Sequence, residues 1–134
     1  MKVVIDTNIF VSSFFGGYPR QVIDLWKQGR ITLCLSKEIV DEYVRVLEGL
    51  GVEEEELKEI LSLFAQGFHC LFTSKTPSLR IVEEDPADDK LFECAVALKA
   101  EYIISGDAAV VRVGDYMGIK VGGPKEFMRR VRSG

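Results

Sequence analysis

The sequence predicts an α/β fold, a three-layer α/β/α sandwich with a central, mainly parallel five-stranded sheet. Short β-type runs alternate with segments of helical periodicity along almost all of the 134 residues. The runs are continuously apolar rather than alternating, which is typical of strands that helices cover on both faces. Alternation of strand and helix favours parallel strands joined by right-handed crossovers.

Five short runs are expected to form the sheet, at residues 3–5, 31–35, 70–72, 102–104 and 119–121. Helices are expected after Pro19 to Gly29, after Ser36 to about Gly49, over residues 53–66, from Asp85 to about Ala100, and from Pro124 onward. Ser36 and Asp85 are good N-caps, Pro86 suits a first helical turn, and glycine ends the first three helices. Residues 73–84 form the most loop-like stretch. With neither a repeat nor a linker in view, residues 1–134 are expected to form a single domain.

Composition narrows the class of protein. Hydrophobic residues make up 47% of the chain and charged residues 28%, a globular balance that provides for a core. No apolar run approaches the ~20 residues that a membrane span requires. The 3 cysteines fit neither a disulfide framework nor a zinc knuckle, so a reduced, cytoplasmic protein is expected. The single histidine, His69, excludes sites that need two histidines, and with them most catalytic zinc sites.

Candidate functional residues follow the predicted strands, because sites in open α/β sheets lie beyond the carboxyl ends of the strands. Asp6, Thr7 and Asn8 follow the first run. Ser105 and Asp107 follow the fourth. The polar side chains of Thr7 and Asn8 are equally explained as locking their loop by hydrogen bonds or as touching a substrate.

Two further carboxylates belong to helix starts near the same edge. Glu42 and Glu48 lie on opposite rims of the apolar face of the second helix, but only Glu42 is close to the helix start, beyond the second strand. In the fourth helix, Asp88 projects along the edge of the apolar stripe at the open N-terminal end, whereas Asp89 lies outside the stripe. Taken alone, Glu42 could equally be a solvated carboxylate that pairs with Arg45, one turn on.

Asp6, Glu42, Asp88 and Asp107 come from four separate segments and are expected to converge at one edge of the sheet. Carboxylates held close together repel one another, and a divalent cation relieves that repulsion. Oxygen ligands without histidine or cysteine favour Mg²⁺ or Mn²⁺ over zinc. Such a site suits phosphodiester hydrolysis, because the ion lowers the pKa of a bound water and stabilises charge on the leaving oxygen.

The motifs at these positions resemble those of the PIN-domain family, Mg²⁺- or Mn²⁺-dependent ribonucleases that include the VapC-type toxins of toxin–antitoxin pairs. The resemblance covers nearly the full chain and rests on four blocks in order, which are VVIDTNI at residues 3–9, LS at 35–36 with EY at 42–43, DPADDKLF at 85–92, and YIISGD at 102–107. One such block alone would say little, but four in order between the right strands are fairly specific.

The resemblance implies a PIN-like fold and an endoribonuclease that hydrolyses RNA with a metal-activated water. In the toxin branch it also implies a homodimer and a protein antitoxin as partner. The catalytic, metal-binding acids of the family correspond to Asp6, Glu42, Asp88 and Asp107. The supporting polar positions correspond to Thr7, Asn8, Ser105 and Asp89, the last of which stands where this branch commonly has Asn.

One departure from the family pattern is Ala109, which stands where a second Asp often follows Asp107. It removes an outer metal contact and leaves open a non-cleaving PIN-like module that binds RNA or protein. A receiver-type signalling domain also has an Asp after its first strand and a Lys after its fifth, here Lys125. Its phospho-accepting Asp should end the third strand, where this chain has Thr73 and Ser74, so the sequence disfavours that class.

RNA has to approach a protein whose formal net charge is −4, which argues against binding by bulk charge. Candidate phosphate contacts are Arg20, at the mouth of the first helix, and the basic C-terminal residues Lys125, Arg129 and Arg130. The C-terminal residues are equally well explained as a solvated helix. Aromatic side chains at positions 14, 15 and 18 are candidates for a dimer or antitoxin interface.

Overall fold

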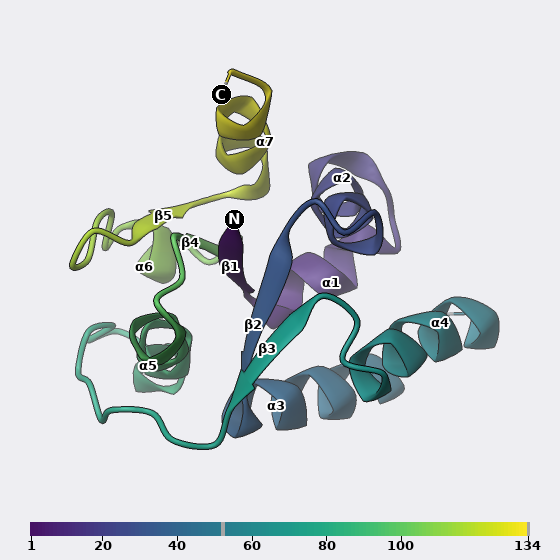
Figure 1. The fold of residues 1–134 in the computed structure, drawn as a ribbon, viewed down its shortest axis with the longest axis horizontal. Helices are drawn as coiled ribbons and strands as arrows, with labels where there is room; N and C mark the ends of the chain where they lie inside the picture. Colours follow the sequence, from purple (N-terminus) through teal and green to yellow (C-terminus); the bar gives the residue numbers. More distant parts are fainter. Residues whose placement is uncertain (52, 134) are drawn as a thin grey trace.

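The computed structural model describes residues 1–51 and 53–133, in which a five-stranded sheet lies between layers of helices (Figure 1). Its strands are β1 (Lys2–Ile5), β2 (Thr32–Ser36), β3 (Cys70–Thr73), β4 (Tyr102–Ile104) and β5 (Lys120–Gly122). They run in the order β3-β2-β1-β4-β5, and every neighbouring pair is parallel. The predicted α/β/α architecture is confirmed, with a sheet that is wholly rather than mainly parallel.

The strand order places a topological switch beside β1. The chain winds outward from β1 to β2 and β3, then crosses to β4 on the other side of β1 and continues to β5. The register pairs Ile5 with Ile104, so β1 and β4 end side by side. Asp6 and Ser105 are the residues that follow these strand ends. The loops they open therefore border the crevice in which doubly wound sheets bind their ligands.

The helices of the described residues are α1 (Thr7–Ser13), α2 (Gly17–Lys27), α3 (Lys37–Glu48), α4 (Glu54–Ala65), the 3₁₀ turn η1 (Pro86–Asp88), α5 (Asp89–Leu98), α6 (Ala108–Val111) and α7 (Pro124–Ser133). Helix α5 packs across β1 to β4 on one face of the sheet. On the opposite side, α2 packs against both α1 and α7 (Figure 1). The sequence did not predict α1 and α6, which are too short to show a helical period and begin directly after Asp6 and Asp107.

An aromatic cluster fixes the helices around the end of β1. The rings of Phe10, Trp26, Tyr43 and Phe64, which belong to α1, α2, α3 and α4, pack against one another in tilted, stacked and edge-on pairs. The buried hydroxyl of Tyr43 donates a hydrogen bond to the carbonyl oxygen of Ile5. This contact anchors α3 directly at the last residue of β1, one residue before Asp6.

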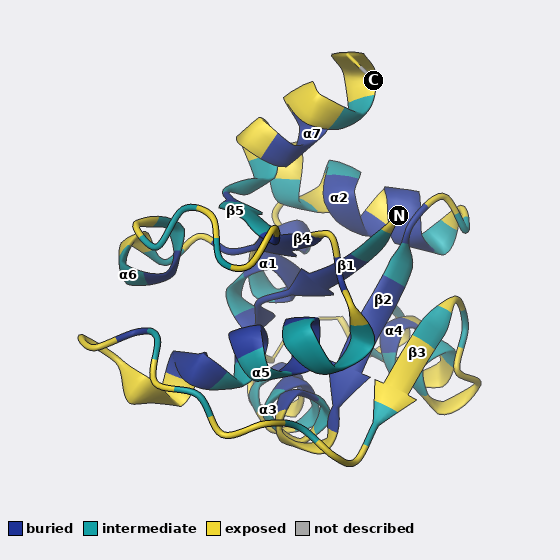
Figure 2. Ribbon diagram, turned by 60° about the vertical axis from the view of Figure 1, so that its left-hand side comes forward, coloured by how far each residue is buried: buried dark blue, intermediate teal, exposed yellow. Residues whose placement is uncertain are grey.

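The edge strand β3 differs from the expectation that helices cover both faces of every strand. Leu71 is 40% exposed and Phe72 is 58% exposed. Figure 2 shows β3 largely exposed at the rim, while β1 and most of β2 are buried. The apolar run at 70–72 therefore predicted the strand correctly but not its full burial.

The three cysteines are free thiols, of which Cys34 and Cys94 are buried and Cys70 is half-buried. Burial raises the pKa of the Cys34 thiol to about 11 and that of Cys94 to about 12, so both are inert thiols near neutral pH. Among the residues that the structure describes, no helix has the length and apolar content that crossing a membrane would take.

Candidate metal centre

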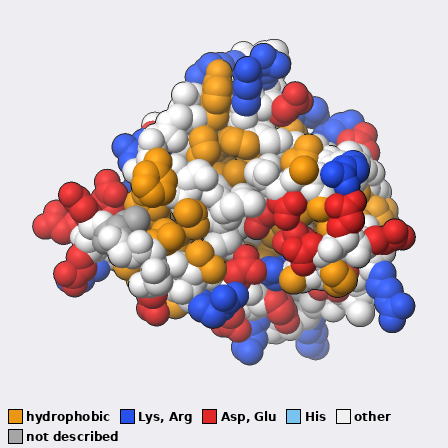
Figure 3. Space-filling view, turned by 180° about the vertical axis from the view of Figure 1, so that it is seen from behind, with side chains coloured by type: hydrophobic (Ala, Val, Ile, Leu, Met, Phe, Trp, Pro, Cys, Tyr) orange, Lys and Arg blue, Asp and Glu red, His pale blue; other side chains and the backbone are white. Residues whose placement is uncertain are grey.

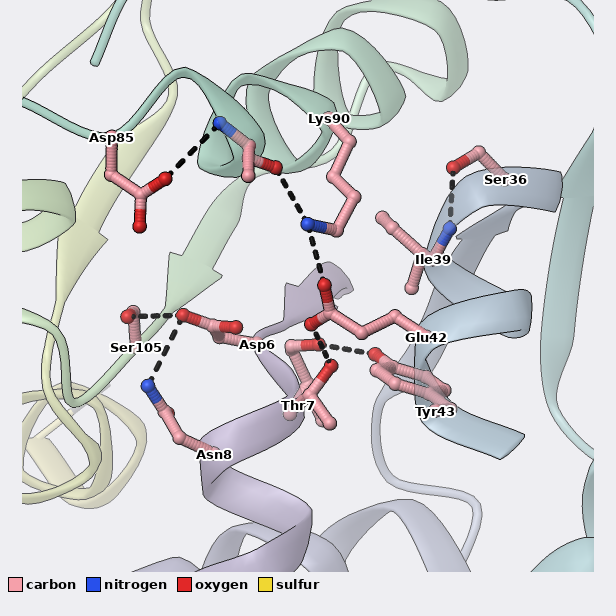
Figure 4. Close-up of polar contacts among 12 residues, drawn as sticks. Asp6, Thr7, Asn8, Ser36, Ile39, Glu42, Tyr43, Asp85, Lys90 and Ser105 are labelled. Carbon is pink, nitrogen blue, oxygen red and sulfur yellow. Dashed lines mark hydrogen bonds and ion pairs between the residues drawn. The ribbon is translucent and has the colours of Figure 1, made fainter. Parts of the chain in front are cut away.

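Asp6 lies at the base of the candidate site, directly after the central strand, and is 5% exposed. Its Oδ2 atom accepts hydrogen bonds from the Ser105 hydroxyl (2.7 Å) and from Asn8 Nδ2 (3.3 Å). The Oδ1 atom of Asn8 accepts a third bond, from the main-chain N–H of Gly106 (3.1 Å). Ser105 and Asn8 thus tie the loops after β1 and β4 together and orient the Asp6 carboxylate (Figure 4). Of the two roles considered for Asn8, the structure shows loop locking.

Glu42 reaches the same crevice from α3, and both of its carboxylate oxygens have partners. Oε1 accepts a hydrogen bond from the Thr7 hydroxyl. Oε2 forms an ion pair with Lys90 Nζ at 2.6 Å. Glu42 therefore pairs with Lys90 and not with Arg45, the partner that the helix spacing allowed. Burial raises the pKa of Glu42, but the hydrogen bonds from Lys90 and Thr7 outweigh burial, so its pKa is lowered overall.

A cluster of three carboxylates forms on the other side of the crevice. Asp85, Asp88 and Asp107 each place a carboxylate oxygen within 4.8 Å of the other two. Asp85 Oδ1 accepts from the Ala87 N–H (3.2 Å), and Asp107 Oδ1 accepts from the Ala109 N–H (2.9 Å). Each of these two side chains is therefore oriented by a turn of its own backbone.

Asp88 is the member of this cluster that most needs a cation. It is 9% exposed, and its Oδ2 atom is buried without a hydrogen-bond partner among the described residues. Burial raises the pKa of Asp88 to about 7, and a hydrogen bond with Asp107 and the charges of Asp6 and Asp85 act in the same direction. Burial likewise raises the pKa of Asp6, with the charge of Glu42 adding to the effect. The crevice therefore holds more negative charge than its hydrogen bonds stabilise.

This donor set fits a divalent cation that prefers oxygen. All the side-chain ligands on offer are carboxylates, an arrangement that suits Mg²⁺ or Mn²⁺ and disfavours zinc. An unpartnered buried carboxylate oxygen is a natural ligand, because coordination supplies the interaction that burial removed. The residues placed to hold an ion are Asp85, Asp88 and Asp107, with Asp6 adjacent.

Of the four predicted acids, the structure brings Asp88 and Asp107 together, with the charge of Asp6 acting on Asp88, while Glu42 is paired with Lys90. It also adds two residues that the sequence did not single out for the site. Asp85 was predicted as an N-cap, which the bond from Ala87 N–H confirms, but its carboxylate also joins the cluster. The spacing of Asp85 and Asp88 along one 3₁₀ turn, which places residues three apart on one side, could have indicated this. Lys90 gave no local signal, because its partner Glu42 belongs to another helix.

Asp89, which was assigned a supporting role, is directed away from the acids. Its Oδ1 atom accepts hydrogen bonds from the main-chain N–H groups of Ile81 (3.0 Å) and Val82 (2.7 Å). Asp89 was expected outside the apolar stripe of its helix, but it is 7% exposed and is one of the buried residues of α5, because its carboxylate binds the main chain of the segment before η1. It supports the site indirectly, by holding the segment that leads to Asp85.

The predicted basic contacts do not lie together around the acids. The Arg20 guanidinium donates to the carbonyl oxygens of residues 13 and 14 at the end of α1. Arg130 stacks over the ring of Tyr102, with its guanidinium carbon 6.0 Å from the ring centre, and lines a cavity with Met1 at the amino end of the sheet. Lys125 and Arg129 are exposed on α7. Figure 3 shows one group of acidic side chains right of the centre of the face in view and another at its left edge, with basic side chains at the top, where α7 lies, and also along the lower and right edges.

The fold and the site define a doubly wound α/β protein with a cluster of carboxylates at its topological switch. A family model described as PIN domain matches residues 2–109, a span that contains all the acids of the site. The chain is also 32% identical to the "Uncharacterized protein MJ1680" of Methanocaldococcus jannaschii, over 96% of this chain and 90% of that protein. The chain belongs to the PIN domain family, whose members are generally nucleases that use a divalent metal.

Proposed function

We propose that this protein is an Mg²⁺- or Mn²⁺-dependent endoribonuclease. The observation that carries the proposal is the buried, unpartnered Oδ2 atom of Asp88 within a carboxylate cluster at the switch point of a PIN fold. A divalent ion at this cluster would lower the pKa of an attacking water and neutralise charge on the phosphodiester. Burial raises the pKa of each of the three thiols, so the cysteines are poor nucleophiles near neutral pH.

The chain's own residues would divide the work as follows. Asp85, Asp88 and Asp107 hold the cation, and Asp6 faces it from the end of β1. Ser105 and Asn8 keep the Asp6 carboxylate in one orientation, so that little reorganisation is needed when RNA binds. With its pKa raised to about 7, Asp88 is also able to exchange a proton near neutral pH when no cation is present.

Contacts with the RNA backbone are proposed for the exposed residues Lys125 and Arg129 of α7. Arg20 and Arg130 are exposed as well but already contact the protein itself, so they would bind phosphate only through their remaining donors. Lys125 follows the carboxyl end of β5, the edge of the sheet at which the acids lie, and Arg129 lies about one turn further along α7. RNA that contacts both α7 and the acids would therefore be a substrate of several nucleotides.

We also propose that the protein is a homodimeric toxin with a protein antitoxin as its partner. We further propose that residues 1–134 form a single domain and that the protein is cytoplasmic. Phe15, at the turn between α1 and α2, is 80% exposed, and Tyr18 nearby is 37% exposed. Exposed aromatic side chains of this kind are enriched in protein interfaces. The free thiols are consistent with a reducing compartment.

The test is cleavage of a structured RNA pool by the purified protein in Mn²⁺, Mg²⁺ or EDTA, beside Asp6→Asn. Asp41→Asn is the matched control, because Asp41 is an exposed acid on α3 next to Glu42. We expect metal-dependent cutting that falls more than about 100-fold in Asp6→Asn and is unchanged in the control. Cutting that survives Asp6→Asn or EDTA would refute the proposal. Binding of RNA without cutting by the wild type would favour the non-cleaving module.

A further inference from the structure

Lys90 is positively charged and lies among carboxylates. Of the described residues that contact the acids of the crevice through an ion pair, it is the one cation. It belongs to the first turn of α5, and its side chain is 14% exposed. The side chains of the other lysines that form ion pairs in the described structure are 32–73% exposed. A lysine ammonium is costly to bury unless it is paired, so its position points to a specific role.

The ammonium group is held from two directions. Lys90 Nζ lies 2.6 Å from Glu42 Oε2 and donates a hydrogen bond to the carbonyl oxygen of Ala87 at 2.6 Å. Figure 4 shows the Lys90 side chain running from α5 toward Glu42, into the space between α3 and the turn that carries Asp85. The charge also reaches the central acid, because it opposes in part the rise in the pKa of Asp6 that burial causes.

The crevice is thereby divided into two halves with different charge balance. Glu42 has both oxygens partnered, by Thr7 and by Lys90. Asp85, Asp88 and Asp107 take part in no ion pair within the described ranges, and Asp88 retains its orphaned oxygen. A divalent ion beside Glu42 would meet the fixed positive charge of Lys90, whereas an ion between the three aspartates would meet only negative charge.

We propose that the Lys90 ammonium is a built-in cation that takes the position of a second divalent ion, so that the protein binds one divalent ion, at Asp85, Asp88 and Asp107. The inference rests on the proposed function in one respect, that the crevice binds a divalent cation. Ala109 agrees with it, since that position offers a main-chain N–H to Asp107 and no further carboxylate. Lys90 is accordingly a positioning residue, which acts on the metal content of the site through Glu42.

The test is the number of Mn²⁺ ions bound, measured by calorimetry and by electron paramagnetic resonance of the unbound ion, without RNA. The variants are Lys90→Met, which keeps an unbranched side chain one atom shorter and removes the charge, and Lys90→Arg, which keeps the charge. The control is Lys37→Met, because Lys37 is an exposed lysine of α3 outside the crevice. Circular dichroism and thermal melting check that each variant is folded.

We expect one Mn²⁺ for the wild type, Lys90→Arg and the control, and two for Lys90→Met. The double variant Lys90→Met with Glu42→Gln should return to one, because the second ion would depend on the freed Glu42 carboxylate. Two ions in the wild type, or one in folded Lys90→Met, would overturn the inference and leave the proposed nuclease intact. No Mn²⁺ binding by the wild type would overturn the proposed metal-dependent function as well.

Discussion

Replacing Asp88 by asparagine should stabilise the metal-free protein above neutral pH. Burial, the hydrogen bond with Asp107 and neighbouring charges raise the pKa of Asp88 to about 7 from an ordinary value of 3.8. Between these values the folded protein binds more protons than the unfolded chain, so the free energy of unfolding falls as pH rises from about 4 to about 7. Asparagine carries no charge, so burial no longer penalises this side chain at high pH, and its amide offers a hydrogen-bond donor near the Asp107 carboxylate.

The size of the effect follows from the difference between the two pKa values. A tenfold change in proton affinity corresponds to about 1.4 kcal/mol, so the rise in pKa from 3.8 to about 7 sets a ceiling of about 4 kcal/mol above pH 7. Asp88 lies beside Asp85 and Asp107, and the repulsion among these carboxylates relaxes when one charge is removed. We therefore expect Asp88→Asn to gain about 2 kcal/mol, which corresponds to about 7 °C in melting temperature for a chain of this length.

The assay is urea unfolding of wild type and Asp88→Asn in EDTA at about pH 5 and about pH 8, with the exposed Asp115→Asn as control. The wild type should lose stability between these two pH values. Asp88→Asn should lose less stability, because the contribution of Asp88 is absent and only Asp6 and other groups still contribute. Millimolar Mg²⁺ should stabilise the wild type at the higher pH and leave Asp88→Asn nearly unchanged. Equal pH dependence of the two proteins in EDTA would refute the assigned environment of Asp88.

Two further predictions concern hydrogen bonds that hold the site in place. Tyr43→Phe leaves the buried carbonyl of Ile5 without its donor and should lower the free energy of unfolding by about 1–3 kcal/mol, measured from urea midpoints. An unchanged midpoint would contradict the bond. Asp89→Asn weakens the bonds from the main-chain N–H groups of residues 81 and 82, so amide hydrogen exchange should accelerate there and not in β1. If the amides of residues 81 and 82 exchange at the same rate in Asp89→Asn as in the wild type, Asp89 does not anchor this segment.

The sheet and the larger helices could be predicted because their signals are local. Apolar runs give the strands, and caps such as Ser36, whose hydroxyl accepts from the Ile39 N–H at 3.3 Å, give the helix starts. The short helix α1 lacks such a signal. Seven residues form too few turns to be stable alone, so this helix depends on packing Phe10 into the aromatic cluster.

The site could be predicted only as far as the strand ends determine it. Asp6 and Asp107 follow β1 and β4, and parallel pairing of adjacent strands brings such residues to one edge whatever their side chains do. The direction of the Asp89 side chain is set by the segment before η1 and not by a strand end. Its carboxylate is drawn to the free N–H groups of the segment before η1, an extended stretch whose course the sequence does not specify.

The charge balance in the crevice, like the direction of the Asp89 side chain, depends on which residues of distant segments meet. Motif resemblance identifies the acids, and it says nothing of the ammonium group that Glu42 meets when α5 packs beside α3. Every positive charge fixed by the fold reduces the number of mobile cations that the same carboxylates can hold. The carboxylates of the candidate site thus come from two strand ends, at Asp6 and Asp107, and from the η1 turn, whereas the charge balance among them depends on the tertiary contact between Lys90 and Glu42.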